Sequence, residues 1–599
     1  MNDKQIEAVT AIEGPVLILA GAGSGKTKAL THRIAYLIAS DIHPENILAV
    51  TFTNKAAGEI KHRVAGLVGG QMPTMGTFHS VCLRMLRQDI KRLEYDRNFV
   101  VYDAQDQEAL MKQCMLEVGL DIKKISPKTM LGRVSELKSE LAGPDEFEEK
   151  VVDVRDEFLA QAYHAYQQNL RKANALDFDD LIMLTVQLLR TKPEVLTKYQ
   201  NLWRYIMIDE YQDTNHAQYV WVNLLAQKYR NLAVVGDDAQ SIYGWRKADI
   251  RNILDFEKDY PEAKVVLLEQ NYRSTQTILT AANHLIANNK SQKQKKLWTD
   301  KADGAPIIVK EANDTLEEGA YVIANIKAGG TVLYRTHAQS RAMEEALVRQ
   351  GIPYRILGGL RFYERREIKD ILAYLRLIAN PKDTVSFVRI CNTPPRGLGP
   401  VALKNKTAPY QKFQDLMDEL RAESERIPLA SLLRFLLKKI DYELYLTADK
   451  SAESIERWEN VKELLTATAG KKLEAFLEEV ALLQETDKLE TEDGAVNLMT
   501  LHSAKGLEFP TVFIIGLEDG VFPHSRSLFD PAQLEEERRL AYVGITRARE
   551  QLHLVFCRQR QLYGSTQLNP PSRFIFEIPE SLVTFIPADE KEFGTTFSY

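Results

Sequence analysis

A glycine-rich segment near the N-terminus constrains the fold of this chain most. It reads Ala-Gly-Ala-Gly-Ser-Gly-Lys-Thr from Ala20 to Thr27, between the apolar run 15–20 and a helical pattern. A strand, a glycine-rich loop and a helix in this order form a phosphate-binding loop, in which backbone N–H groups and the positive helix end surround phosphates. We predict that Lys26 contacts the β- and γ-phosphates and that Thr27 ligates Mg²⁺. The predicted loop residues are Ala20, Gly21, Ala22, Gly23, Ser24, Gly25, Lys26 and Thr27.

Short apolar runs recur along the chain and predict two α/β sheets. They are continuous rather than alternating, which is typical of parallel strands covered on both faces. Two long helical patterns, 85–175 and 370–490, interrupt them. We therefore predict two parallel sheets, each interrupted by a mainly helical insertion. The predicted strands are 15–20, 47–52, 205–209, 232–236 and 264–268 in the first sheet, and 331–334, 354–357, 496–500, 511–515 and 553–556 in the second.

The composition is that of a soluble globular protein with several domains. The 599 residues are 45% hydrophobic and 27% charged, and no run of about 18 apolar residues predicts a membrane span. The polar N-terminus does not resemble a signal peptide. Four widely separated cysteines argue against a metal cluster or a disulfide framework and indicate a reducing cytoplasm. A net charge of −6 neither favours nor forbids nucleic-acid binding.

Charged residues far apart in the sequence indicate nucleotide hydrolysis. Asp209 and Glu210 follow an apolar strand, where the first would hold Mg²⁺ and the second would orient and deprotonate the attacking water. Such a pair is often only a helix cap, but the phosphate-binding loop favours the hydrolytic interpretation. Arg273 and Arg547 could stabilise charge on the transferred phosphoryl group, although either alone would more often be a structural residue in an ion pair. A nucleotide held between two domains would indicate a motor.

The motifs, taken in order, resemble those of superfamily 1A helicases of the UvrD/PcrA/Rep type. The resemblance implies an ATP-dependent 3′→5′ DNA helicase or single-strand DNA translocase that uses ATP and Mg²⁺ in repair, recombination control or replication restart. The alternatives are a translocase that removes bound proteins with little unwinding, and an ATP-gated DNA-binding clamp. The matching segments are 2–5, 20–27, 51–57, 76–80, 176–181, 209–215, 236–246, 270–274, 498–509 and 536–548.

The resemblance also implies a domain arrangement. Residues 1–84 and 176–266 would form the ATP-binding RecA-like domain 1A, with 85–175 as its helical insertion 1B. Residues 267–369 and 491–599 would form the RecA-like domain 2A, with 370–490 as insertion 2B. This 2B segment is shorter than usual, which leaves autoinhibition and duplex engagement open, although 393–399 resembles a duplex-contacting turn. We expect no long C-terminal tail.

The family assigns a nucleotide role to several residues. Lys28 stands where relatives usually have an arginine against adenine, and lysine stacks less well. Tyr272 would stack on adenine, Gln5 would read its edge, and Glu508 would contact the ribose. The expected γ-phosphate and Mg²⁺ neighbours are Lys26, Thr27, Asp209, Glu210, Gln240, Arg273 and Arg547.

A sequence-independent single-strand track needs aromatic platforms and backbone contacts. Taken singly, each candidate aromatic is more often a core residue, and each histidine a structural one. For Trp245 and Phe52, a place inside a motif reverses this and favours the track. We expect single-stranded DNA and single/double-strand junctions as partners, no membrane, and a monomer or weak dimer; protein partners are not indicated. The stacking candidates are Phe52, Phe178, Tyr243, Trp245 and Tyr563, and the contact candidates are Thr77, His79 and His502.

Overall fold

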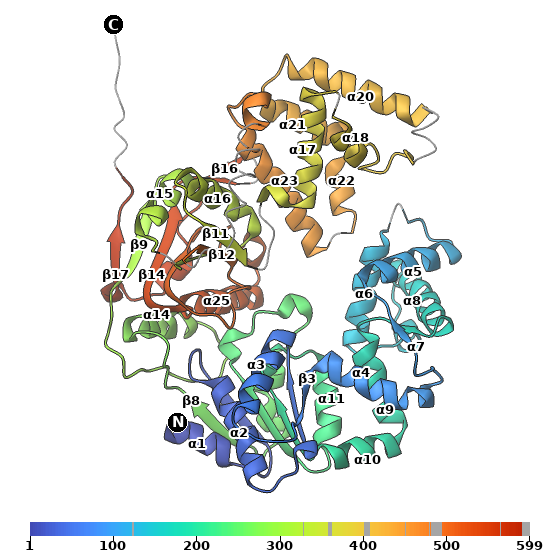
Figure 1. The fold of residues 1–599 in the computed structure, drawn as a ribbon, viewed down its shortest axis with the longest axis vertical. Coiled ribbons are helices and arrows are strands. Elements are labelled where there is room, and N and C mark those ends of the chain that lie inside the picture. The colour runs from blue at the N-terminus through green and yellow to red at the C-terminus, as the bar shows by residue number, and fades with distance from the viewer. Residues whose placement is uncertain are drawn as a thin grey trace. The chain divides into compact units, whose positions relative to one another are not determined.

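The computed structural model divides the chain into two compact units, residues 1–302 and 303–599 (Figure 1). Each unit carries its own parallel sheet and its own group of helices. The predicted α/β class with two parallel sheets is confirmed. The described residues are 1–122, 125–327, 329–357, 362–381, 383–399, 408–449, 451–477, 480, 494–562 and 565–589.

The first unit is built on a six-stranded sheet in the order β3-β2-β6-β7-β1-β8. Every pairing in it is parallel, so the carboxyl ends of all strands lie at one edge. Ligand sites of open parallel sheets lie at this edge. The strands are β1 (Val16–Ala20), β2 (Ile47–Thr51), β3 (Thr74–Thr77), β6 (Tyr205–Ile208), β7 (Asn231–Gly236) and β8 (Lys264–Leu268).

Helices cover both faces of this sheet, as its continuous apolar strands require. Alternate residues of β1 point to opposite faces, and Leu17 packs in one hydrophobic core while Ile18 packs in the other. Leu17 shares its core with α4, α9 and α11, and Ile18 shares its core with α1, α2 and α3. These helices are α1 (Asp3–Thr10), α2 (Lys26–Ala39), α3 (Asn54–Ala65), α4 (Phe78–Asp89), α9 (Asp180–Thr191) and α11 (His216–Ala226).

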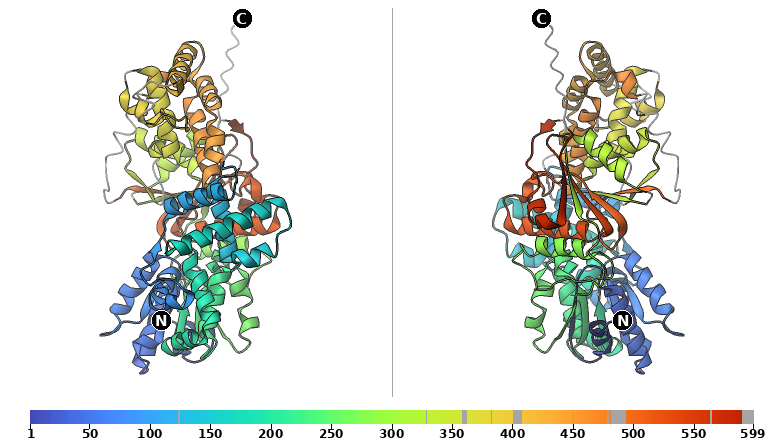
Figure 2. Two further views of the ribbon diagram at one scale, coloured as in Figure 1. Left: turned by 90° about the vertical axis from the view of Figure 1, so that its right-hand side faces the viewer. Right: turned by 90° about the vertical axis from the view of Figure 1, so that its left-hand side faces the viewer.

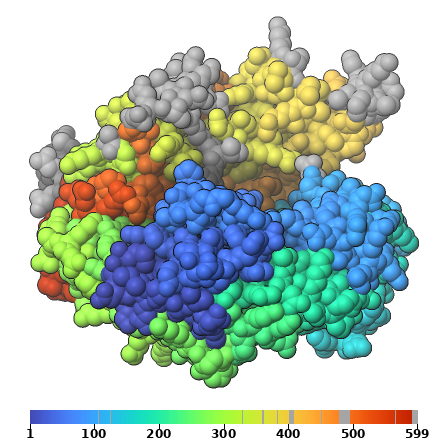
Figure 3. All heavy atoms as spheres, turned by 60° about the horizontal axis from the view of Figure 1, so that its bottom comes forward, coloured from blue at the N-terminus to red at the C-terminus, as the bar shows by residue number. Residues whose placement is uncertain are grey.

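A helical lobe is inserted between β3 and β6. It has its own hydrophobic core, and Figure 3 shows its lighter-blue atoms beside the darker-blue atoms of the sheet-bearing part of the unit. The buried ammonium of Lys138 lies 2.6 Å from Asp177 and 2.7 Å from Asp180. This ion cluster ties α6 to the start of α9. The lobe contains α5 (Ala104–Glu117), α6 (Pro127–Ser139), α7 (Pro144–Glu148) and α8 (Val154–Lys172).

Around these elements, the first unit is completed by short strands and further helices. A two-stranded parallel ribbon joins the lobe to the sheet-bearing part, and α14 follows β8. The remaining elements are β4 (Val100–Val101), β5 (Ala175–Leu176), α10 (Pro193–Leu202), α12 (Arg251–Leu254), α13 (Phe256–Asp259) and α14 (Gln276–Ile286).

The second unit is built on a seven-stranded sheet in the order β11-β12-β10-β13-β14-β9-β17. All its pairings are parallel. Its helices outside the insertion are α15 (Thr315–Asn325), α16 (Ser340–Arg349), α25 (Pro531–Ile545) and α26 (Arg573–Phe576). The strands are β9 (Ile307–Ala312), β10 (Thr331–Tyr334), β11 (Tyr354–Leu357), β12 (Val496–Thr500), β13 (Phe509–Ile514), β14 (Ala548–Cys557) and β17 (Val583–Ile586), with a separate hairpin of β15 (Arg560–Leu562) and β16 (Ser565–Gln567).

A second helical lobe lies between β11 and β12 and is drawn in yellow and orange in Figure 2. Leucine, isoleucine and aromatic side chains from its helices form one hydrophobic core. In the part of the chain that the structure describes, no helix is both long and apolar enough to cross a membrane. The lobe contains α17 (Arg366–Ala379), α18 (Thr384–Ile390), α20 (Ala408–Ser424), α21 (Leu429–Lys439), α22 (Tyr442–Thr447) and α23 (Ala452–Thr468).

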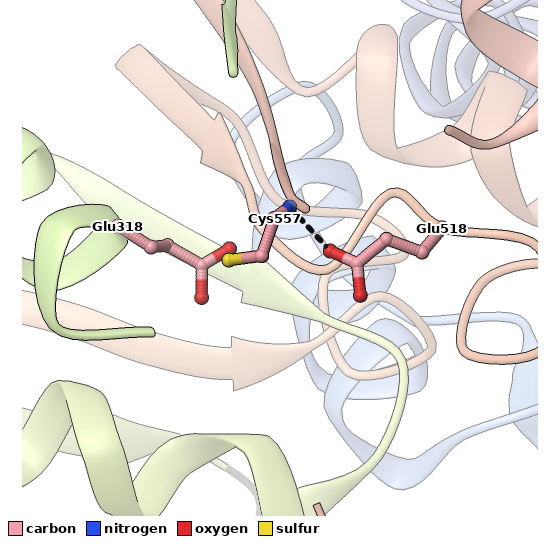
Figure 4. A group of neighbouring side chains, drawn as sticks. All are labelled: Glu318, Glu518 and Cys557. Atoms are coloured by element: carbon pink, nitrogen blue, oxygen red, sulfur yellow. Dashed lines mark hydrogen bonds between the residues drawn. The ribbon is translucent and has the colours of Figure 1, made fainter. Parts of the chain in front are cut away.

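Two buried carboxylates and a thiol lie together in the second unit: Glu318, Glu518 and Cys557 (Figure 4). Such a group could hold a metal ion, but the guanidinium of Arg560 already donates to both carboxylates at 2.7–2.9 Å. Burial raises the pKa of the Cys557 thiol well above its usual value. Arg560 therefore supplies both carboxylates with hydrogen bonds from one cation, and the cluster joins α15 to the end of β14 as a structural element.

Candidate functional site

The glycine-rich loop of residues 21–25 joins β1 to α2 at the carboxyl edge of the first sheet. Gly23 and Gly25 have φ of 66° and 86°, a region that residues with a side chain rarely adopt. A Cβ at Gly23 would lie 2.5 Å from Asn271 Nδ2, so a larger residue would displace its neighbours. The tight loop leaves the first N–H groups of α2 available to an anion. Its geometry fits the phosphates of a nucleotide.

Residues 270–273 pack directly against this loop. The Asn271 side chain donates to the Ala22 carbonyl at 2.6 Å, and the Tyr272 N–H donates to the Gly23 carbonyl at 3.0 Å. Asn271 also accepts from the N–H of Arg273 at 2.7 Å. The structure thus brings the predicted Tyr272 and Arg273 to the loop, with the Tyr272 ring 48% exposed.

The N-terminal helix holds the other predicted base-reading residue against the loop. Gln5 is buried, and its side chain donates to the Ser24 carbonyl at 2.9 Å. Asn2 caps α1 in a reciprocal capping box with Gln5 and donates to Gln270 Oε1 at 2.8 Å. Lys28 is exposed in the first turn of α2. Gln5 and Lys28 both lie beside Gly25, since a Cβ added there would be 2.8 Å from Gln5 Nε2 and 3.8 Å from Lys28 Cβ.

The acidic pair lies at the same sheet edge, after β6. Asp209 is buried, and its N–H donates to the Val50 carbonyl at 2.9 Å. Glu210 has a left-handed backbone with φ of 52°, which is uncommon for a residue with a side chain and clusters at functional sites. Gln212 Nε2 donates to Glu210 Oε2 at 2.6 Å. The strained turn therefore fixes the direction of the Glu210 carboxylate.

A buried carboxylate after β7 connects these groups. Asp237 Oδ2 accepts from Gln240 Nε2 at 2.5 Å and lies 3.9 Å from the Lys26 ammonium. The Asp237 N–H donates to Gln212 Oε1 at 2.9 Å. Burial opposes the ionisation of Asp237, but the ammonium groups of Lys295 and Lys26 hold its pKa below the usual value. The predicted Lys26, Gln240 and Glu210 thus belong to one network.

A groove of about 570 Å³ in the first unit contains most of the predicted track residues. The Phe52 and Tyr243 rings stack at 5.8 Å, and Trp245 meets Tyr243 edge-on at 6.3 Å. Trp245 and Phe178 are 57% and 53% exposed, which is unusual for such large apolar side chains. The groove lining includes Phe52, Thr53, Asn54, Thr77, His79, Ser135, Glu136, Phe178, Asp179, Trp245, Arg246 and Lys247.

Polar residues of the groove have local partners. The Thr77 hydroxyl accepts from the Ser80 N–H at 3.3 Å and so caps α4. The His79 and Phe178 rings stack with centres 3.8 Å apart. Glu136 from α6 and Lys247, both in the groove lining, form an ion pair. The groove therefore combines stacking surfaces with charges of both signs.

Protonation of His79 is expected to destabilise the first unit in mild acid. Burial lowers the pKa of His79 from 6.5 to about 4, so between these values the folded state binds fewer protons than the unfolded chain. The free energy of unfolding must then fall as the pH falls through this window. From pH 7 to pH 5 this group should contribute a loss of about 2 kcal/mol.

The measurement is urea unfolding at pH 7 and pH 5, followed by tryptophan fluorescence, for the parent and for His79→Asn. Four of the five tryptophans report on the first unit, namely Trp203, Trp221, Trp245 and Trp298. The variant should lose less stability on acidification than the parent. An equal loss in both proteins would contradict the assigned pKa.

The predicted residues of the second unit lie on two segments. Arg547 is 1% exposed and donates to the carbonyls of Val543 at 2.9 Å and Leu507 at 3.1 Å. Glu508 forms an ion pair with Arg549. His502 is half-buried in the turn after β12. Tyr563 lies outside the described residues, so its predicted place in the track stays a prediction.

The turn 393–399 is folded around its own arginine. The Arg396 guanidinium donates to the Ile390 and Thr393 carbonyls, each at 3.1 Å, and to the Tyr374 hydroxyl at 2.5 Å. A side chain with these partners shapes the loop. Duplex contact by this turn would have to come from its backbone or from neighbouring side chains.

Family models match both units. Residues 1–261 match the model described as UvrD/REP helicase N-terminal domain, and residues 266–426 and 407–559 match the UvrD-like helicase C-terminal domain. The chain belongs to the UvrD/Rep helicase family. The predicted resemblance is confirmed.

Curated relatives cover almost all of the chain. The protein named ATP-dependent DNA helicase PcrA from Bacillus subtilis (strain 168) is 47% identical, over 97% of this chain and 86% of the relative. Proteins of the same name from Staphylococcus aureus (strain Mu50) and Staphylococcus epidermidis are 46% and 45% identical, each over 97% of this chain and 87% of the relative. The Bacillus match runs over 637 aligned positions, more than the 599 residues of this chain, so that relative carries residues with no counterpart here.

Sequence reasoning missed several residues of the network. Asn271, Asp237 and Lys295 were not predicted as site residues, yet Asn271 holds the loop and the other two form a buried ion pair. A signal existed for Asp237, which follows the apolar strand β7 as Asp209 follows β6. For Lys295, which lies in a lysine-rich segment, the sequence offers no signal, because burial decides its role.

Proposed function

We propose that this protein is an ATP-dependent DNA helicase that moves 3′→5′ along one DNA strand. The observation that carries the proposal lies in the segment 236–246. It begins beside the phosphate-binding loop, where Asp237 accepts from Gln240 and faces Lys26, and ends in the aromatic groove at Trp245. One short segment can therefore transmit the state of the nucleotide to the DNA track. Family membership and the relatives named ATP-dependent DNA helicases support the same activity, and the polarity rests on the family.

The nucleotide chemistry follows from the residues at the sheet edge. Lys26 and the loop N–H groups would bind the phosphates, and Thr27 and Asp209 would hold Mg²⁺, which would neutralise phosphate charge. Glu210, oriented by Gln212, would accept the proton of the attacking water. These donors suit a hard cation and a triphosphate, since they are oxygens, N–H groups and one ammonium.

The remaining nucleotide residues keep their predicted roles in this proposal. Tyr272 and Lys28 would flank adenine, with Gln5 at its edge. Arg273 beside the loop would stabilise charge on the transferred phosphoryl group. For the second unit we propose that Arg547 acts on the same charge and Glu508 on the ribose.

The groove would hold single-stranded DNA by stacking. Phe52, Phe178, Tyr243 and Trp245 would meet bases, while Thr77, His79, His502 and Tyr563 would contact the strand. Stacking accepts any base, as a translocating protein requires. We further propose single/double-strand junctions as the preferred substrate, a monomer or weak dimer, and the division into domains 1A, 1B, 2A and 2B at the predicted boundaries.

Steady-state ATP hydrolysis with and without oligo-dT tests the proposal. We expect strong stimulation by the oligonucleotide that weakens as salt rises, because phosphate contacts release counterions. Duplexes with a 3′ or a 5′ single-stranded tail then test direction, and only the 3′-tailed duplex should be unwound. Hydrolysis indifferent to DNA in folded protein would overturn the helicase proposal. Stimulated hydrolysis without unwinding would instead identify a translocase, in keeping with the shortened 2B segment.

A further inference from the structure

Lys295 is a buried cation at the nucleotide network. Its ammonium lies 2.6 Å from Asp237 Oδ1 and also pairs with Asp238. The Lys295 side chain is 7% exposed, and both carboxylates are fully buried. Burial by itself lowers the pKa of Lys295, but the two aspartates outweigh it and raise the pKa to about 12. The charged ammonium of Lys295 therefore lies in the protein interior, at the carboxyl end of β7. This strand neighbours β1, which leads into the phosphate-binding loop.

Asp237 shares its two oxygens between this cation and the catalytic network. Oδ1 accepts from Lys295 and from the Ala239 N–H at 3.2 Å, while Oδ2 faces Gln240 and Lys26. The Lys26 distance of 3.9 Å is long for an ion pair, and the Lys295 distance is short. Lys295 is thus the closer countercharge of Asp237, and Lys26 is the more easily released.

Binding of a nucleotide would change this balance. Phosphates carry more negative charge than Asp237, so Lys26 would turn toward them, and Asp237 would lose one of its two countercharges. A buried carboxylate without a countercharge is costly. It would also draw Lys26 back and repel the γ-phosphate. Lys295 would prevent both effects, because it stays on Asp237 whichever partner Lys26 takes.

We propose that Lys295 is a positioning residue for ATP hydrolysis, an inference that rests on the proposed function of the loop. It keeps Asp237 ionised and in place while Lys26 exchanges between Asp237 and a triphosphate. The Asp237 carboxylate in turn orients Gln240, while its backbone N–H donates to Gln212, which donates to Glu210. Lys295 should therefore strengthen the binding of a triphosphate more than the binding of a diphosphate. Without Lys295, the negative charge of Asp237 would repel the γ-phosphate most strongly.

The test compares equilibrium affinities of fluorescent ADP and a fluorescent non-hydrolysable ATP analogue, without DNA. In Lys295→Met the preference for the ATP analogue over ADP should fall by about tenfold. This change is a modest part of the interaction energy between two charges about 4 Å apart. Lys295→Arg, which keeps the charge, should restore most of the preference. Lys293→Ala is the matched control: it removes a side chain paired with Glu257 and keeps the backbone N–H that donates to Asp238 at 2.9 Å.

The double variant Lys295→Met/Asp238→Asn covers a failure of the single variant to fold. It removes one charge of each sign, so the interior stays balanced, yet Asp237 still lacks its closer cation. Its triphosphate preference should fall as well. A parental preference in either folded variant would overturn the proposal. The readout needs neither DNA nor turnover, so a parent whose hydrolysis ignores oligo-dT would refute the helicase function and leave this test intact.

Discussion

Replacement of Lys26 by alanine is expected to lower the turnover of DNA-stimulated ATP hydrolysis by on the order of 10²–10³-fold or more. The Lys26 ammonium is 12% exposed, lies 3.2 Å from the Ala20 carbonyl and faces Asp237. It would stabilise charge that grows on the phosphates during transfer. Alanine would remove this stabilisation, while Lys295 would still pair with Asp237.

Turnover at saturating ATP and oligo-dT measures this effect, and circular dichroism checks the fold. Lys258→Ala is the matched control, because it removes an exposed lysine of the same unit whose ammonium pairs with Asp255 at 2.7 Å. This control should hydrolyse ATP as the parent does. Parental turnover in folded Lys26→Ala would remove the phosphate-binding loop from the mechanism.

The central strands could be predicted from sequence because burial on both faces leaves continuous apolar runs. β1, β2 and β7 are buried at every residue, and all three were predicted. β9 was missed because Lys310 and Glu311 interrupt its run. Lys310 is nevertheless 3% exposed, and its ammonium pairs with Glu317 at 2.9 Å. Glu317 lies outside the strand, so the composition of the strand alone does not indicate that Lys310 is buried.

Two further strands escaped prediction for other reasons. β3 reads Thr-Met-Gly-Thr and has too few apolar side chains to stand out, although pairing with β2 defines it. Among the strands that the structure describes, β17 pairs with β9 alone, and it exposes Thr584 and Phe585. Strands of this kind are determined by their neighbours, which the local sequence does not contain.

The residues of the candidate site likewise divide into those that the local sequence indicates and those that distant neighbours determine. Residues that follow strands, such as those at 20–27 and 209–210, could be predicted, because the carboxyl ends of parallel strands meet at one edge. The bond from Asn271 to the Ala22 carbonyl joins residues 249 positions apart, and no local pattern indicates it. Family motifs supplied part of this information, since they mark 270–274 without saying what Asn271 contacts.

Replacement of Trp245 by alanine is expected to uncouple ATP hydrolysis from DNA. The Trp245 ring is 57% exposed in the groove, with the Arg246 guanidinium 4.5 Å from its centre. Stacking of one base on such a ring contributes about 1–3 kcal/mol. The oligo-dT concentration for half-maximal stimulation should therefore rise about 5–150-fold. Hydrolysis without DNA should stay near that of the parent, because the ring is outside the network of Lys26 and Glu210.

A graded pair of variants separates stacking from other effects of the change. Trp245→Phe keeps an aromatic face and should lie between the parent and Trp245→Ala. Phe158→Ala is the control, since Phe158 is 36% exposed on α8 and does not line the groove. Unwinding should fall with stimulation, because a base that is not held cannot be advanced by a conformational change at the nucleotide. Unchanged unwinding in Trp245→Ala would mean that Phe52, Tyr243 and Phe178 hold the strand without it, and that the segment 236–246 transmits the nucleotide state by another side chain.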